Sequence, residues 1–194
     1  NNAVKYKAIS NSALYLPILE GLLKTLDPDI KSVVKLTEVE NTFAIKMKNQ
    51  AVIVKDGIIV GNNILSSGTK AGLEIAYIIA SLAANLHDLY YCDELFSYVN
   101  SDIEKACLSI IIDKLTERKQ LFFTTHNLEI LDMQLPKHSF VFLKKNVFDE
   151  EHPIKCISAS QYLKRNTDSL KSAVENDLFC TAPDLSLLFD IMNV

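Results

Sequence analysis

The sequence lacks the features that mark several classes of protein. Its four cysteines are widely spaced and form no CxxC pair, which argues against a zinc site or a disulfide framework and favours reduced thiols. It has no apolar run long enough to span a bilayer and no signal-peptide pattern, so we expect a cytoplasmic protein without a membrane partner. The net charge of −4 gives no support for binding to nucleic acid.

Glycine is also scarce, with five residues in the chain, and one of them lies in the run Ser66-Ser67-Gly68-Thr69. This run separates a strand-like segment from a helix-like segment. The first N–H groups of a helix lack intrahelical acceptors, and the helix dipole favours negative charge there, so the run is suited to cradle an anion. Ser and Thr are also preferred helix caps, and an ordinary cap is the alternative interpretation at this point.

In the first third of the chain we expect a helical lead-in over residues 1–30, which would be the end of an upstream helical region. Antiparallel strands are expected to follow over residues 33–64. Apolar residues recur at helical spacing between Ser12 and Thr25, and Pro28 then disfavours helical geometry. The strand region is rich in β-branched residues, and Asp56-Gly57 between two apolar runs indicates a hairpin. We therefore expect an antiparallel β-meander here.

Helices and strands alternate in the remainder of the chain. The predicted elements are, in order, helix 69–86, strand 89–92, helix 102–119, strand 121–125, a short helix 128–131, strands 139–145 and 154–159, and helix 161–176. The strands are nearly continuous apolar runs. This pattern predicts an α/β fold with a mostly parallel sheet flanked by helices and covered on both faces.

Reactive side chains follow two of these strands. Asp93-Glu94 comes directly after strand 89–92, and His126-Asn127 follows strand 121–125. Ligands of open α/β sheets bind outside the carboxyl ends of the strands, where both groups lie. Each group taken alone also has a structural explanation, as a helix cap, a solvated loop residue or a structural histidine.

Three motifs in fixed order resemble the C-terminal lobe of the ABC-type ATPases. LSSGT, from Leu65 to Thr69, resembles the LSGGQ signature, and LYYCDE, from Leu89 to Glu94, resembles the Walker B strand with its glutamate. FFTTHN, from Phe122 to Asn127, resembles the switch-histidine segment. The resemblance runs from Leu65 to Asn127, about a third of the chain. It is nearest to the non-transporter branch: recombination-repair, SMC-like and phage-defence "AAA family" ATPases of P-loop NTPase fold.

The resemblance implies a role for each motif residue. Leu65, Ser66, Ser67, Gly68 and Thr69 would bind nucleotide across a dimer, Asp93 would hold Mg²⁺, Glu94 would polarise the attacking water, and His126 would sense the γ-phosphate. Ser97 and Asn100 would lie in the dimer loop that follows Walker B. Asn100 stands where the family has an aspartate, which puts that dimer contact in doubt.

The main departure from the family is the absence of any GxxxxGK[ST] P-loop in the 194 residues. Phosphoryl transfer depends on positioning and charge neutralisation, and without a P-loop the β- and γ-phosphates lack their main binding element. We therefore expect the isolated chain to be inactive. The expectation is a C-terminal lobe over residues 31–194, with a signature, Walker B and switch core at 65–145 and a C-terminal strand and helices at 146–194. An N-terminal P-loop half or second protomer would complete it, forming a homodimer that uses ATP and Mg²⁺ as a switch in DNA repair or phage defence.

Two other functions remain open from the sequence. The first is a non-catalytic interaction lobe of the same fold that binds no nucleotide. The second is a metal-dependent nuclease built on Asp93, Glu94 and His126, although two-metal hydrolysis needs several convergent carboxylates and the chain offers one adjacent pair here.

Overall fold

The computed structural model describes residues 14–61, 64–146, 151, 153–165, 168–183, 185, 189 and 191. The fold is mixed α/β, as expected, and the chain divides into two compact units, Asn1–Asn127 and Leu128–Val194. Residues 1–13 of the predicted helical lead-in and Asn62-Asn63 of the predicted strand region lie outside the described residues.

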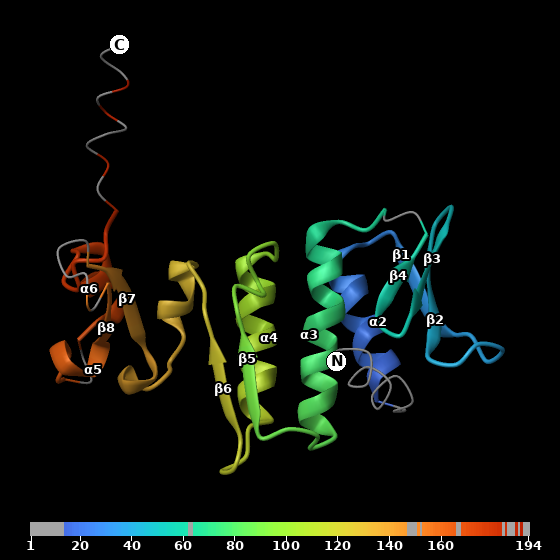
Figure 1. Cartoon of the computed structure of the whole chain (residues 1–194), viewed down its shortest axis with the longest axis horizontal. Coiled ribbons are helices and arrows are strands. Elements are labelled where there is room, and N and C mark those ends of the chain that lie inside the picture. The colour runs from blue at the N-terminus through green and yellow to red at the C-terminus, as the bar shows by residue number, and fades with distance from the viewer. Residues whose placement is uncertain are drawn as a thin grey trace. The chain divides into compact units, whose positions relative to one another are not determined.

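The first unit contains the predicted antiparallel meander (Figure 1). The strands pair in the order β1-β2-β3-β4, with bounds β1 Ile30–Lys35, β2 Thr42–Met47, β3 Ala51–Lys55 and β4 Ile58–Val60. Asp56 and Gly57 connect β3 to β4 with φ angles of +50° and +80°. Positive φ at both central residues matches the twist of a two-residue hairpin, so the hairpin prediction is confirmed.

Helix α2 (Tyr15–Leu26) packs its apolar face against this sheet. Tyr15, Leu19 and Leu23 recur at intervals of four and are fully buried with Phe43, Ile45, Val52 and Val54 from the strands. Glu20 fixes the helix to the sheet edge, because its Oε2 accepts the Val33 N–H at 2.9 Å while Oε1 accepts from Lys24 Nζ at 2.6 Å. These hydrogen bonds, from Lys24 and then Val33, lower the pKa of Glu20.

Helix α3 (Ser67–Ala83) lies against α2 and connects the meander to the strands that follow it in the chain. A Cβ at Gly72 would lie 2.6 Å from Leu26 Cδ1, so the missing side chain permits the close approach of the two helices. Near the end of α3, the buried Ser81 hydroxyl donates to the Tyr90 hydroxyl at 2.8 Å. This contact joins the C-terminal part of α3 to strand β5 (Leu89–Cys92).

Strands β5 and β6 (Gln120–Phe123) form a two-stranded parallel sheet, with α4 (Ser101–Asp113) in the crossover (Figure 1). Leu89 pairs with Gln120 and Cys92 with Phe123, so the two strands end side by side. Tyr90 and Cys92 are buried, whereas Leu89, Tyr91 and Phe122 on the opposite face are 61%, 67% and 56% exposed. The prediction that the sheet is covered on both faces is therefore wrong for these strands.

The second unit also departs from a mostly parallel sheet. It contains short helices η1 Leu128–Asp132, η2 Lys137–Ser139, α5 Ala159–Tyr162 and α6 Leu170–Glu175, and strands β7 Val141–Lys145 and β8 Ile154–Ser158. Strands β7 and β8 pair antiparallel. Their connection, residues 146–153, is shorter than the dozen or so residues that a parallel crossover needs. Among the described residues, β5 and β6 are the one parallel pair.

The helix predicted over 161–176 is replaced by α5 and α6. The chain leaves α5 at Leu163, which is extended, and Asp168 Oδ2 accepts the Arg165 N–H at 2.8 Å. Ser169 then caps α6 by accepting the Ser172 N–H at 3.1 Å. Asp and Ser compete for backbone hydrogen bonds in helix interiors and favour turns and caps, which explains the interruption.

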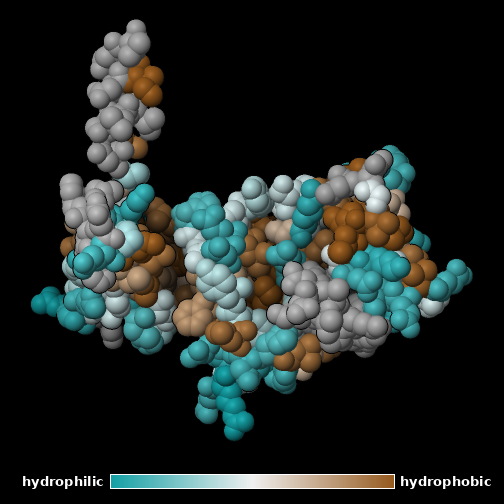
Figure 2. All heavy atoms as spheres, viewed as in Figure 1, coloured by the Kyte–Doolittle hydropathy of each residue, from teal (hydrophilic) through white to brown (hydrophobic). Residues whose placement is uncertain are grey.

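Some apolar residues remain on the surface of the first unit. Ile58 and Val60 on edge strand β4 are exposed, and hydrophobic side chains gather on the visible surface over the four-stranded sheet (Figure 2). A three-residue edge strand offers little backbone for unwanted pairing. Within the described part of the chain, no helix combines the length and apolar character needed to cross a bilayer.

The four free thiols fall into two classes that alkylation can separate. Burial, with a smaller contribution from Glu74 or Glu104, raises the pKa of Cys92 and of Cys107 to about 11, whereas Cys156 and Cys180 are exposed. Because the thiolate is the nucleophile, we expect iodoacetamide at pH 8 to modify Cys156 and Cys180 roughly a hundredfold faster than the buried pair. Peptide mass spectrometry measures this, with urea-unfolded chain as control. Equal rates in the folded chain would contradict the assignment.

Candidate functional site

Thr124 links the acidic pair to the neighbouring strand. Its hydroxyl donates to Asp93 Oδ1 at 2.7 Å and accepts the Glu94 N–H at 2.9 Å, while its own N–H donates to the Cys92 carbonyl at 2.9 Å. The parallel register makes this contact, because Asp93 and Thr124 each follow the last residue of a paired strand. The carboxylate of Asp93 is thereby oriented while remaining exposed.

Glu94 has a backbone conformation that non-glycine residues rarely adopt, with a φ of +45°. Such a conformation costs on the order of 1 kcal/mol and persists where neighbouring contacts enforce it. Here the Thr124 hydroxyl holds the Glu94 N–H, and the Ser97 N–H donates to the Glu94 carbonyl at 3.0 Å. The Ser97 hydroxyl also approaches Glu94 Oε2 at 3.4 Å, and the Glu94 carboxylate is exposed.

The signature-like run forms the N-terminus of α3. Ser66 is the N-cap, with its Oγ accepting the Thr69 N–H at 3.0 Å and lying 2.7 Å from Thr69 Oγ1. The ordinary-cap interpretation therefore describes the local structure. Leu65 and Thr69 are buried, so among the predicted nucleotide-binding residues only Ser66, Ser67 and the half-buried Gly68 present atoms to solvent.

Gly68 brings this helix start to the loop that follows the acidic pair. A Cβ on Gly68 would lie 2.7 Å from the backbone oxygen of Tyr98, a separation that real Cβ atoms essentially never show. The glycine is therefore required by a close approach of two backbones. The structure thus joins two of the predicted segments, the signature-like turn and the Asp93-Glu94 loop, through Tyr98.

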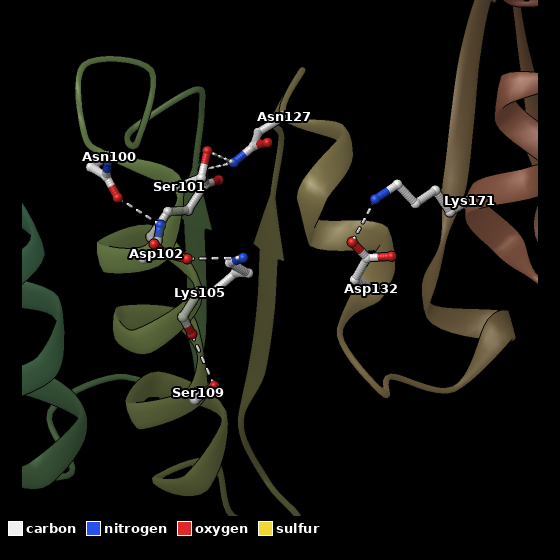
Figure 3. A network of polar contacts seen from close by, with 9 residues as sticks. Asn100, Ser101, Asp102, Lys105, Ser109, Asn127, Asp132 and Lys171 are labelled. Carbon is white, nitrogen blue, oxygen red and sulfur yellow. Dashed lines mark hydrogen bonds and ion pairs between the residues drawn. The ribbon is translucent and has the colours of Figure 1, made fainter.

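His126 is exposed and lies between two anchored neighbours. Thr125 Oγ1 donates to Glu104 Oε1 at 3.0 Å, and Asn127 Nδ2 donates to Glu104 Oε2 at 2.6 Å. Asn127 Nδ2 also donates to Ser101 Oγ at 3.1 Å (Figure 3). Because His126 is two residues beyond Thr124, it lies at the same carboxyl edge of the parallel pair as Asp93.

The two predicted dimer-loop residues have local structural roles. Asn100 is the N-cap of α4, and its Oδ1 accepts the Asp102 N–H at 2.9 Å (Figure 3). Ser97 supports the loop at Glu94 by donating its N–H to the Glu94 carbonyl. Neither contact requires a second protomer, and both side chains remain on the surface.

The donor chemistry at Asp93 fits one Mg²⁺ and does not fit a protein-only metal cage. The exposed Asp93 carboxylate is a hard oxygen group, and Mg²⁺ is commonly held by one or two carboxylates together with substrate phosphates and waters. Among the described residues, no three His, Cys, Asp or Glu side chains come together in a group able to hold a metal. This finding gives no support to the two-metal nuclease alternative.

Sequence reasoning missed Thr124, Glu104 and Tyr98. Thr124 and Tyr98 act through contacts between segments distant in sequence, which no local pattern reports. Glu104 did carry a signal, because it shares the helical spacing of the buried residues Cys107, Leu108 and Ile111. A carboxylate on the apolar face of a helix needs buried partners, and that requirement could have identified it.

Comparison of the chain with protein-family models and with curated proteins finds no match.

We expect Gly68→Ala to destabilise the chain by about 1–3 kcal/mol, because the added methyl group would force the α3 start away from Tyr98. Gly21→Ala is the matched control: it lies within α2 with nothing within 4 Å of an added Cβ, and should stabilise the chain by about 0.5–1 kcal/mol. Urea unfolding measures both. A Gly68→Ala free energy of unfolding no lower than that of the unaltered chain would rule out the contact.

Proposed function

We propose that this chain is the C-terminal lobe of a non-transporter ABC-type ATPase, active only when a P-loop-bearing half completes it. The observation that carries the proposal is the junction at the ends of β5 and β6. There one hydroxyl orients the Asp93 carboxylate and holds Glu94 in a left-handed backbone conformation. Strained residues of this kind cluster at active sites, and this one coincides with the glutamate of the Walker B-like motif.

In the proposed reaction each residue acts mainly through its position. Glu94 accepts a hydrogen bond from the attacking water and withdraws its proton. His126 contacts the γ-phosphate, and the exposed Ser66 and Ser67, with the backbone at Gly68, face phosphate oxygens of a second nucleotide. Ser66 can keep its capping contact in this role, because a hydroxyl oxygen accepts one hydrogen bond while its proton is donated elsewhere.

Asp93 is the residue that would hold Mg²⁺ in this proposal. When bound together with ATP, Mg²⁺ would neutralise part of the negative charge of the phosphates. The hydrogen bond from Thr124 to Asp93 Oδ1 would restrict the orientation of the carboxylate and leave it able to accept a metal ion.

The uncovered face of the parallel pair supports the need for a completing half. Parallel sheets occur almost only with both faces covered, and a two-stranded sheet is marginal by itself. Leu89, Tyr91 and Phe122 lie exposed on one face of β5 and β6. A P-loop-bearing half, supplied by another segment or a second protomer, would cover these apolar side chains. The full protein would then act as an ATP-driven dimerisation switch in the cytoplasm, serving DNA repair or phage defence.

A non-catalytic interaction lobe is the second candidate. The observation in its favour is that Ser66 and Asn100 have complete local roles as helix caps, for which no nucleotide is needed. Mixing this chain with a P-loop-bearing half separates the two functions. ATP-dependent association supports the ATPase lobe, whereas association that ignores ATP supports the interaction lobe.

In a protein that joins this chain to its P-loop half, we expect Glu94→Gln to lower ATP turnover by about 10²–10⁴-fold while ATP binding survives, because only water activation is lost. The variant should accumulate as an ATP-bound dimer. Steady-state hydrolysis and size-exclusion chromatography with ATP measure the two effects. Glu117→Gln, an exposed carboxylate before β6, is the control and should hydrolyse normally. Wild-type turnover in Glu94→Gln would show that Glu94 is misassigned.

A further inference from the structure

Glu104 is a buried carboxylate on a helix face that is otherwise apolar. Its residue exposure is 2%, and it shares the covered side of α4 with Cys107, Leu108 and Ile111. Burying a carboxylate is costly unless both oxygens are hydrogen-bonded. An apolar residue at this position would pack with its neighbours without that cost, so the hydrogen-bond partners of Glu104 indicate what the carboxylate is for.

Both partners come from the segment that carries His126. Thr125 donates to one carboxylate oxygen and Asn127 to the other, and Thr125 Oγ1 also accepts the Asn127 N–H at 3.0 Å. The side chains of Glu104, Thr125 and Asn127, together with the Asn127 backbone N–H, form a closed ring of hydrogen bonds, and two of its members flank His126 in the sequence. Residues 124–127 have no regular secondary structure, so this ring supplies the restraint that a helix or strand would otherwise provide.

We propose that Glu104 is a positioning residue that fixes the place of the His126 imidazole at the carboxyl edge of β5 and β6. The role of His126 itself rests on the proposed ATPase function. A catalytic side chain on an irregular segment reaches its working geometry only when surrounding hydrogen bonds restrict it, and small displacements are costly in rate. Glu104 provides that restriction from helix α4, through its hydrogen bonds to Thr125 and Asn127, without contacting substrate.

The first test uses the chain itself and needs no ATP. In Glu104→Gln one carboxylate oxygen that accepts a hydrogen bond is replaced by an NH₂ group, which weakens the ring. We therefore expect the backbone N–H of Asn127 to exchange with solvent about tenfold faster than in the unaltered chain. The Leu108 amide, within α4, reports any general loosening and should change less. Asp102→Asn, the same charge change on an exposed side chain of the same helix turn, should leave Asn127 unchanged. An unchanged Asn127 rate in Glu104→Gln would overturn the proposal.

Variants at Thr125 test the ring of hydrogen bonds that the proposal requires, and they remain informative if Glu104→Gln unfolds. Thr125 is exposed, so its replacement by valine leaves the apolar packing of the core in place and removes the hydroxyl that donates to Glu104 Oε1. Thr125→Val removes the hydroxyl from the ring and should accelerate exchange at Asn127 in the same direction. Thr125→Ser retains the hydroxyl and should restore the original rate, an outcome that a merely steric role of Thr125 would not produce. Equal rates in the two variants would contradict the ring.

The second test separates this proposal from the proposed function. In the protein completed by a P-loop half, Glu104→Gln should lower kcat about tenfold, with the KM for ATP changed less than about twofold, because ground-state binding depends on the P-loop. An inactive wild-type protein would refute the ATPase function, while the exchange result would still decide whether Glu104 restrains the segment. An active wild type with an unchanged kcat in Glu104→Gln would overturn the positioning role.

Discussion

Parallel pairing of β5 with β6 is the constraint on which the candidate site depends. Because Cys92 and Phe123 are partners at the ends of these strands, Asp93 and Thr124 emerge side by side. One threonine hydroxyl then orients a carboxylate and holds Glu94 at a positive φ. A change in register would separate these groups, so the geometry of two short strands determines whether the acidic pair can work as a unit.

The candidate segments at this edge are two loops and the first turn of α3, and each is held by a contact with a segment distant in sequence. Thr124 of the neighbouring chain segment holds the acidic pair, Tyr98 packs against Gly68 at the start of α3, and Glu104 of α4 anchors the residues on both sides of His126. Loops carry function when rigid elements position them. Two of these contacts are made by residues of α3 and α4, whose other residues lie in the core. The stability of the first unit is thereby linked to the order of the segments at the carboxyl ends of β5 and β6.

The sequence predicted those parts of the fold that local patterns determine. The β-meander followed from β-branched runs and Asp56-Gly57, and the helix that became α3 followed from apolar spacing. Long-range features were predicted less well: β7 and β8 pair antiparallel, and Tyr91 is exposed on a strand that reads as buried. At the site, the sequence suggested the reactive groups but not Thr124, Tyr98 or Glu104, because their roles arise only from contacts across the fold.

The central claim is that Thr124 and Asp93 interact directly at the strand ends, and a double-mutant cycle measures that interaction. Thr124→Val, Asp93→Ala and the double variant would be compared by urea unfolding of the chain. A hydroxyl-to-carboxylate hydrogen bond in this exposed setting predicts a coupling free energy of about 1 kcal/mol. Additive effects, with a coupling of about zero within the usual 0.3 kcal/mol, would contradict the account.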